Sequence, residues 1–237
     1  MIRFGLIGTN WITERFVEAA RDADGIAITA VCSRTAERGA AFAEKIGVPR
    51  VYTDEAEMAA GGEVDAVYIA SPNYAHAGSA IACLEAGIHV LCEKPLASNA
   101  AEVRRMIDAS RRGGATLMEA VKSTLMPNFR MIRDRLPELG TIRRYFASYC
   151  QYSSRYDAFR SGTVLNAFNP ELSNGALMDL GIYCIYPAVV LFGAPRGVKA
   201  SGTLLSSGAD GGGGLLLDYG DMEGVVQYSK ISNSYVP

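Results

Sequence analysis

The sequence has no block of basic residues, no closely spaced cysteine pair and few lysines. Its 23 basic and 25 acidic side chains give a net charge of −2, so we expect no nucleic-acid partner. The five cysteines are odd in number and none are spaced C-x-x-C, which argues against a disulfide framework or a zinc site and favours a reducing, cytoplasmic compartment. Because no cluster of His, Cys and carboxylate residues has ligand spacing, we predict no metal site.

Long apolar segments are also scarce. The first five residues lead directly into a strand-like run and lack the apolar stretch of a signal peptide. The most apolar segment, 176–192, contains Asp179, Gly181 and Pro187 and is marginal in length for crossing a bilayer, so we predict a buried helix and no membrane partner. With 49% hydrophobic and 20% charged residues, the composition indicates a globular protein.

Apolar runs alternate with amphipathic segments over the first 120 residues. This pattern predicts strands at 2–7, 26–32, 66–70, 88–92 and 115–118, and helices at 11–21, 35–46, 75–86 and 100–112. Thr35 can cap the second helix, and Gly87 can end the third. The alternation indicates an α/β fold, with a parallel sheet covered by helices on both faces.

The pattern changes near residue 120, and nine of the 12 tyrosines follow it. We predict a helix at 128–136, strands at 142–152, 198–205, 215–219 and 224–229, and a glycine-rich loop at 211–214. These runs predict a second, α+β domain from residue 121, built on a mostly antiparallel open sheet.

Ligands of a parallel sheet bind along the edge formed by the carboxyl ends of its strands. The first strand ends in a partial G-x-G-x-x-G motif, in which Gly8 is present but Asn10 and Thr13 replace the second and third glycines. Asn tolerates unusual backbone angles, so a pyrophosphate-binding turn is still feasible. The alternative is an ordinary tight turn between strand and helix.

The second and third strand ends also carry polar residues. Ser33 and Arg34 follow the second strand, where NAD-binding folds usually place an acidic residue, so they favour the 2′-phosphate of NADP over NAD. The alternative for Arg34 is a solvated side chain at a helix start. At the third end, Asn73 can bind cofactor or cap a helix, and His76 is more often structural than catalytic in such a place.

The fourth strand end is Glu93-Lys94-Pro95. Lys94 is one of only five lysines, and it directly follows a predicted buried strand. An ammonium in a cofactor cleft can exchange a proton with an alcohol or carbonyl oxygen, which makes Lys94 a candidate catalytic residue. The alternative is a Glu93–Lys94 pair at the surface.

A fifth candidate lies in the predicted helix 175–186, whose one charged residue is Asp179. Tyr183 lies four residues further on and therefore on the same face. A carboxylate in an apolar helix must find a partner or line a wet cleft, so this face is a candidate for proton transfer. The alternative is a buried aspartate that orients a neighbouring loop.

Together, the turn at 5–12 and the segments 71–73, 93–95 and 178–183 resemble the glucose–fructose oxidoreductase, inositol dehydrogenase and MocA (Gfo/Idh/MocA) family, collinearly over the whole sequence. The resemblance implies a Rossmann domain at 1–120 that binds NAD(P). It further implies a second domain at 121–237 that binds substrate and forms homo-oligomers through its sheet. It also implies hydride transfer between nicotinamide and a sugar, cyclitol or related diol.

In that family, catalysis is assigned to a lysine, a downstream acid and a proton-relay residue, which correspond here to Lys94, Asp179 and Tyr183. The relay residue is a histidine or a tyrosine in different branches of the family. With tyrosine at position 183, this sequence resembles the branch that contains dihydrodiol and NADP-linked xylose dehydrogenases. We predict that the cofactor contacts Gly8, Thr9, Asn10, Trp11, Ile12, Ser33, Arg34, Ser71, Pro72, Asn73, His76, Glu93 and Lys94. Substrate specificity is expected in the segment 152–173, with Arg155, Tyr156, Arg160 and Asn166 as candidates.

A non-catalytic sensor of a dinucleotide or sugar, or an inactive fragment, are the alternatives, although a pure binder does not need a proton-transfer set. The alternating pattern is still running at Val236 and Pro237, and members of the family continue for on the order of a hundred further residues. We therefore expect an incomplete second domain with an unpaired sheet edge.

Overall fold

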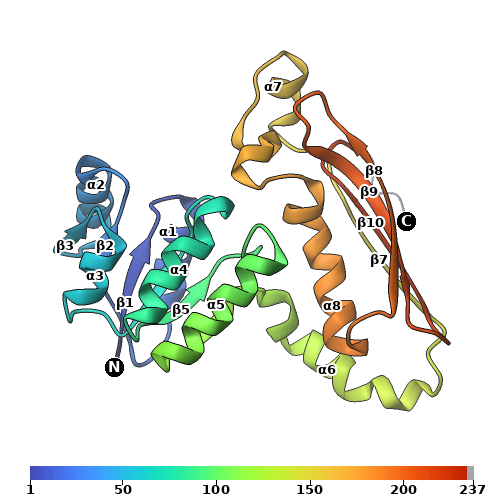
Figure 1. Cartoon of the computed structure of the whole chain (residues 1–237), viewed down its shortest axis with the longest axis horizontal. Helices are drawn as coiled ribbons and strands as arrows, with labels where there is room; N and C mark the ends of the chain where they lie inside the picture. Colours follow the sequence, from blue (N-terminus) through green and yellow to red (C-terminus); the bar gives the residue numbers. More distant parts are fainter. Residues whose placement is uncertain (234–237) are drawn as a thin grey trace. The chain divides into compact units, whose positions relative to one another are not determined.

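The computed structural model describes residues 1–233 and divides into two compact units, residues 1–120 and residues from 121 onward (Figure 1). Each unit has its own sheet. The alternating pattern at Val236 and Pro237 lies outside the described residues.

The first unit is a six-stranded parallel sheet in the order β3-β2-β1-β4-β5-β6. Its strands are β1 (Ile2–Ile7), β2 (Ile26–Cys32), β3 (Arg50–Tyr52), β4 (Ala66–Ile69), β5 (His89–Cys92) and β6 (Leu117–Glu119). Its helices are α1 (Trp11–Arg21), α2 (Ala36–Ile46), α3 (Glu55–Ala60), α4 (His76–Glu85) and α5 (Ala100–Gly113). The chain winds outward from β1 in both directions, which is the doubly wound Rossmann arrangement, and the predicted α/β fold is confirmed.

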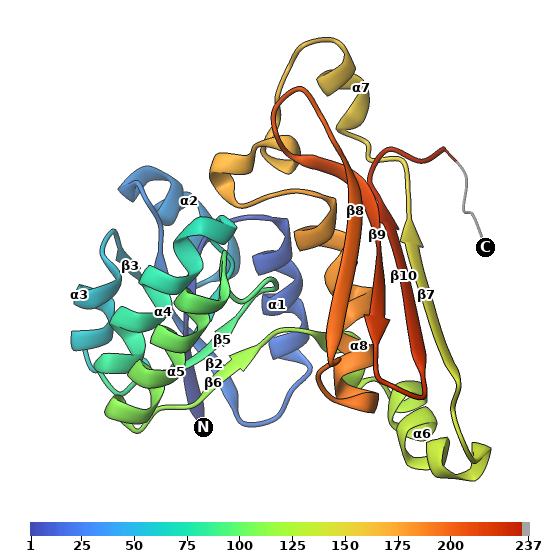
Figure 2. The same cartoon turned by 45° about the vertical axis from the view of Figure 1, so that its right-hand side comes forward.

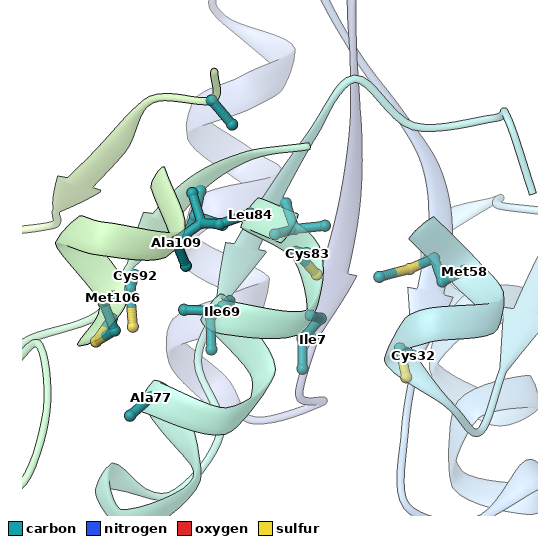
Figure 3. Packing of buried hydrophobic residues seen from close by; sticks show 14 of the residues in the cluster. Ile7, Cys32, Met58, Ile69, Ala77, Cys83, Leu84, Cys92, Met106 and Ala109 are labelled. Atoms are coloured by element: carbon teal, nitrogen blue, oxygen red, sulfur yellow. The ribbon is translucent and has the colours of Figure 1, made fainter. Parts of the chain in front are cut away.

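Two hydrophobic clusters hold helices to the two faces of this sheet. One cluster contains Met58, Ile69, Leu84 and Met106 (Figure 3). The other contains Leu6, Val17, Val31, Phe42 and Tyr68. Successive residues of β4 point to opposite clusters, and both are buried, which explains why this strand is apolar without interruption.

Most predicted elements of this unit are present with small shifts at their ends. Thr35 caps α2 through a hydrogen bond from the Arg38 amide, so the helix begins one residue later than predicted. Gly87 follows α4 with a φ of +80°. The strand β3 and the helix α3 were not predicted, because β3 has only three residues and α3 only six.

The second unit contains a four-stranded mixed sheet in the order β7-β10-β9-β8 (Figure 2). Its strands are β7 (Arg144–Cys150), β8 (Gly197–Leu204), β9 (Asp210–Asp218) and β10 (Glu223–Ser229). β10 pairs with β7 in parallel and with β9 antiparallel, and β9 pairs antiparallel with β8. Two short helices, α6 (Pro127–Arg135) and α7 (Tyr156–Arg160), precede and follow β7.

The predicted loop at 211–214 is wrong, because these four glycines lie within β9. Gly213 pairs with Tyr228 of β10 and with Gly202 of β8. A Cβ atom at Gly213 would lie 2.6 Å from the Tyr228 hydroxyl and 2.6 Å from the Ser201 carbonyl oxygen. The glycine therefore makes room for a neighbouring ring and strand rather than for a turn.

One face of the second sheet is covered by a π-helical turn, Leu177–Gly181, which continues into α8 (Ile182–Phe192). Leu180, Cys184 and Ala188 from this segment pack against Leu217 and Val226 of the sheet. The predicted helix is confirmed, although its first turn is π-helical. By length and composition alone the helical stretch Pro170–Phe192 is able to cross a membrane, but here it supplies one layer of the unit's core.

Candidate active site

Gly8 forms the turn after β1 and adopts a φ of +101°. A Cβ atom at this position would lie only 2.7 Å from the Ala70 carbonyl oxygen. The close approach brings the first strand end against the third strand end, and only glycine fits there. This is the turn for which the sequence predicts pyrophosphate binding.

Asn10 does not adopt the unusual backbone angles that the sequence suggested. Its φ of −108° and ψ of 179° are those of extended chain. Instead, its side-chain oxygen accepts hydrogen bonds from the amides of Ile12 (2.9 Å) and Thr13 (3.4 Å), while its side-chain nitrogen donates to the Ala70 carbonyl (2.5 Å). The residue at the second glycine position is therefore the N-cap of α1.

Thr13, at the third glycine position, is fully buried and donates a hydrogen bond of 3.0 Å to the Gly8 carbonyl. Trp11 lies on the first turn of α1 with 67% of its surface exposed. Asn10 and Thr13, which replace glycines of the motif, thus fix the turn by hydrogen bonds. The exposed ring of Trp11 lies beside the turn.

At the second strand end, Ser33 is buried and its amide donates to the Tyr52 carbonyl (3.0 Å). Arg34 is exposed and forms no ion pair within residues 1–233. Its guanidinium is therefore available to an anion at this edge of the sheet.

His76 links the third and fourth strand ends. Its Nδ1 lies 2.9 Å from the Pro95 carbonyl oxygen and its Nε2 lies 2.9 Å from the Ser71 carbonyl oxygen. The side chain is 1% exposed, and this burial lowers the pKa of the imidazole although both contacts act in the opposite direction. These contacts favour the structural role for His76.

Ser71 and Asn73 flank the same link. The Ser71 hydroxyl is buried and has no hydrogen-bond partner within residues 1–233, so it is a candidate to bind a ligand atom. Asn73 opens the short 3₁₀ turn Asn73–Ala75 and does not cap α4, whose N-cap is Ala75.

The fourth strand end forms a partly buried polar cluster. The hydroxyl of Tyr68 donates to Glu93 (2.7 Å), and the amide of Lys94 donates to the same carboxylate (3.2 Å). Burial, followed by the Glu93 charge, raises the pKa of Tyr68. Glu93 therefore binds a buried tyrosine. The Lys94–Pro95 peptide bond is cis.

Glu119 belongs to this cluster and was missed, because the sequence analysis ended that strand at residue 118. It is the last residue of β6, pairs with Cys92, and accepts a hydrogen bond from the Leu96 amide (2.8 Å). Burial and then the Glu93 charge raise the pKa of Glu119, while the Leu96 hydrogen bond and the Lys94 ammonium lower it. The sequence signal that could have identified Glu119 is an acidic residue directly after the apolar run 115–118.

In the second unit, Asp179 lies in the π-helical turn and is 37% exposed. Its Oδ2 lies 2.9 Å from Nζ of Lys230, which is only 2% exposed. The ring of Tyr183 lies 5.6 Å from that of Tyr149. π-Helical turns occur frequently at functional sites, so this turn is consistent with the predicted role of Asp179.

Lys230 was also missed by the sequence analysis. It follows β10 directly, in line with Gly224, Val226 and Tyr228, which face the covering helix. A lysine at an inward position of an alternating strand, in a chain with five lysines, was the signal that could have identified it.

The four predicted substrate residues lie in and near α7. Tyr156 belongs to a group of aromatic rings with Tyr152, Phe159 and Phe168. Arg155 precedes α7, Arg160 ends it, and Asn166 begins the following 3₁₀ turn. Arg160 lies 3.7 Å from Asp157 on the surface.

The predicted site residues thus form two sets. Lys94 and the predicted cofactor residues line the strand ends of the first unit, whereas Asp179, Tyr183 and the substrate candidates belong to the second.

Two family models match most of the chain. The model described as "Oxidoreductase family, NAD-binding Rossmann fold" matches residues 2–121, and the "GFO/IDH/MocA C-terminal domain" matches residues 130–235. The chain belongs to the Gfo/Idh/MocA family. The predicted resemblance is confirmed, and the chain is therefore an NAD(P)-dependent oxidoreductase by family.

Relatives in this family act on cyclitols and diols. The chain is 59% identical to the scyllo-inositol 2-dehydrogenase (NADP(+)) of Bacillus subtilis, over 100% of this chain and 72% of that protein. It is 32% identical to the trans-1,2-dihydrobenzene-1,2-diol dehydrogenase of Mus musculus, over 98% of this chain and 69% of that one.

A solved structure shows the same fold. The 3-ketoreductase KijD10 from Actinomadura kijaniata, in complex with NADP and TDP-benzene, is 29% identical with a TM-score of 0.83. The match covers 98% of this chain and 71% of that one.

Proposed function

We propose that this Gfo/Idh/MocA oxidoreductase interconverts a cyclitol of the scyllo-inositol type and its ketone, with NADP as cofactor. The observation that carries the proposal is the 59% identity to a scyllo-inositol 2-dehydrogenase over the whole chain. A cytoplasmic location is part of the proposal, since this chemistry depends on a small-molecule cofactor pool.

The residues of the first unit fit a dinucleotide. A Cβ atom at Gly8 would clash with the Ala70 carbonyl, so the turn lies tight against that strand end, and α1 presents its N-terminus beside it. Arg34 at the end of β2 offers a guanidinium to a 2′-phosphate, and no acidic residue takes that place. When bound, the nicotinamide supplies the hydride acceptor or donor.

Lys94 exchanges a proton with the substrate oxygen as the bond to hydrogen at carbon breaks or forms. Its position beside Glu93 and Glu119 at the strand ends supports this role. Tyr183 assists the proton exchange, and Asp179 orients the reacting groups or binds a neighbouring hydroxyl.

The test compares Lys94→Ala with Lys45→Ala, an exposed lysine of α2 in the same unit. Because general acid–base catalysis contributes about 10²–10⁴-fold, kcat for scyllo-inositol should fall by about that factor in Lys94→Ala. NADPH affinity should fall far less than kcat in Lys94→Ala, although Lys94 is among the predicted cofactor contacts, and should be unchanged in Lys45→Ala. Near-normal turnover of Lys94→Ala would overturn the assignment, and NADPH binding without turnover of any cyclitol, sugar or diol would favour the sensor.

Cofactor preference is tested with Arg34→Ala and with Arg38→Ala, an exposed arginine of the following helix α2. Hydrogen bonds to a charged group contribute about 1.5–3 kcal/mol, so Arg34→Ala should weaken NADPH binding about 10- to 150-fold. NADH binding should be unchanged. Equal effects of the two substitutions on NADPH affinity would contradict the role of Arg34.

We also propose that the second sheet forms a homo-oligomer through the face not covered by α8. Phe146, Val225 and Leu216 pair across β7, β10 and β9 on that face, and Phe146 and Leu216 are each 50% exposed. Phe146→Asp should shift the sedimentation coefficient toward that of a single chain. An unchanged assembly, or a wild-type protein that sediments as a monomer, would refute this interface.

A further inference from the structure

Lys230 is a buried lysine that none of the proposed steps uses. It follows β10 on the face that carries Val226 and Tyr228, and only 2% of its side chain is exposed. Lysine is almost never fully buried unless it is paired. Its burial therefore has to be explained by what surrounds the ammonium group.

Within residues 1–233, three groups surround that ammonium. Nζ lies 2.9 Å from Oδ2 of Asp179, donates a hydrogen bond of 3.0 Å to the Ala167 carbonyl, and lies 5.4 Å from the centre of the Phe168 ring. A carboxylate, a carbonyl and an aromatic face are the partners that compensate a buried cation.

The two partners of the ion pair differ in exposure. The side chain of Asp179 is 37% exposed whereas that of Lys230 is 2% exposed. The carboxylate is therefore accessible to a solute, while its Oδ2 is bound by the buried Lys230 ammonium. The pair also joins a helical turn to the end of a central strand. Such a bond restricts the directions in which the carboxylate can point.

The same ammonium holds the segment that was predicted to contact substrate. Ala167 and Phe168 lie in the 3₁₀ turn Asn166–Phe168, and the ring of Phe168 contacts those of Tyr156 and Phe159. One buried charge therefore ties Asp179 to the aromatic group of the α7 region.

We propose that Lys230 is a positioning residue, whose buried ammonium fixes the Asp179 carboxylate and the Asn166–Phe168 turn together in the arrangement that the substrate requires. This inference rests on the proposed cyclitol dehydrogenase activity. Lys230 acts through Asp179 and takes no part in proton transfer itself.

The experiment is a double-mutant cycle with Lys230→Met and Asp179→Asn, measured as kcat/KM for scyllo-inositol with NADP. Lys230→Met should lower kcat/KM at least tenfold, and the double variant should be no worse than Asp179→Asn alone, because both changes remove one interaction. Lys199→Met, on the exposed edge strand β8, is the matched control and should leave kcat/KM unchanged.

Two further variants separate charge from structure. Lys230→Gln keeps a donor for the Ala167 carbonyl but has no charge, so it should be as impaired as Lys230→Met, whereas Lys230→Arg should recover most of the activity. Circular dichroism and NADPH affinity report whether each variant is folded. Additive losses in the cycle, full activity of Lys230→Gln, or no recovery in a folded Lys230→Arg would each overturn the proposal.

The same cycle measured by urea unfolding separates this inference from the proposed function. If the wild-type protein turns over no cyclitol, the proposed function fails and the positioning role falls with it, while coupled unfolding free energies would still show that the ion pair forms. If the wild type is active and the cycle is additive, only the positioning role fails.

Discussion

Replacing Gly8 by alanine should damage both the stability of the first unit and its affinity for NADP. The added Cβ would meet three backbone atoms, namely the oxygen and carbon of Ala70 at 2.7 and 2.9 Å and the nitrogen of Ser71 at 3.1 Å. Backbone atoms of a neighbouring strand end cannot move aside as a flexible side chain can. The turn itself must therefore shift.

The magnitude follows from two separate costs. A residue other than glycine at a φ of +101° costs about 1–2 kcal/mol, and overpacking adds about 1–3 kcal/mol, so the total is about 2–5 kcal/mol. Gly25 is a matched control, because its φ is +80° but a Cβ atom there would meet nothing within 4 Å. Gly25→Ala should lose only the first cost, about 1–2 kcal/mol.

Urea unfolding measures the stability loss, and Trp11 measures the affinity. Trp11 is the one tryptophan of the chain and lies on the helical turn beside Gly8, so energy transfer to the reduced nicotinamide reports NADPH binding. Gly8→Ala should weaken this binding at least tenfold, whereas Gly25→Ala should leave it unchanged. Equal stability losses in the two variants, together with unchanged NADPH affinity, would refute the reasoning.

Three further predictions follow from the first unit. Asn10→Ala removes the cap of α1, which contributes about 1 kcal/mol, and a hydrogen bond to a backbone carbonyl of about 1 kcal/mol, so urea unfolding should show a loss of about 2 kcal/mol. Burial lowers the pKa of His76, so the unfolded chain binds the proton more readily and the unfolding free energy should fall as the pH drops below about 6.5. His76→Gln should abolish this slope and His89→Gln, at an exposed histidine, should retain it. Glu119→Gln removes a negative charge beside Lys94, so the acid limb of the kcat/KM profile for polyol oxidation should move to lower pH; a shift to higher pH would contradict the placement of this carboxylate.

Strong periodicity made most of the first unit predictable. Residues such as Val67 and Ile69 face one cluster and Tyr68 the other, and such runs are recognisable because both faces of the sheet are buried. β3 and α3 are too short, at three and six residues, for a strand or helix periodicity of hydrophobic residues to be recognised.

The errors in the second unit have a different origin. From the sequence alone, a glycine in a turn cannot be told from a glycine in a strand that lies against a tyrosine ring. In this chain, the pairing of Gly213 with Tyr228 shows that the glycine belongs to a strand. Asp179 could be singled out from its apolar helix, but its partner Lys230 lies on another element far along the chain. Such a contact follows from sheet topology rather than from local spacing.

The parallel pairing of β7 with β10 has a consequence for how the chain folds during synthesis. Every pairing in the first unit joins residues within the first 120, so that unit is able to fold as soon as it leaves the ribosome. β7 lies at one edge of the second sheet and, within residues 1–233, pairs only with β10, for example Arg144 with Glu223. β7 therefore stays unpaired until β10 has been synthesised. When β10 pairs with β7, the intervening segment of the chain is closed into a long loop. The same pairing brings Lys230, directly after β10, beside Asp179. The ion pair therefore cannot form until β10 and Lys230 have been synthesised.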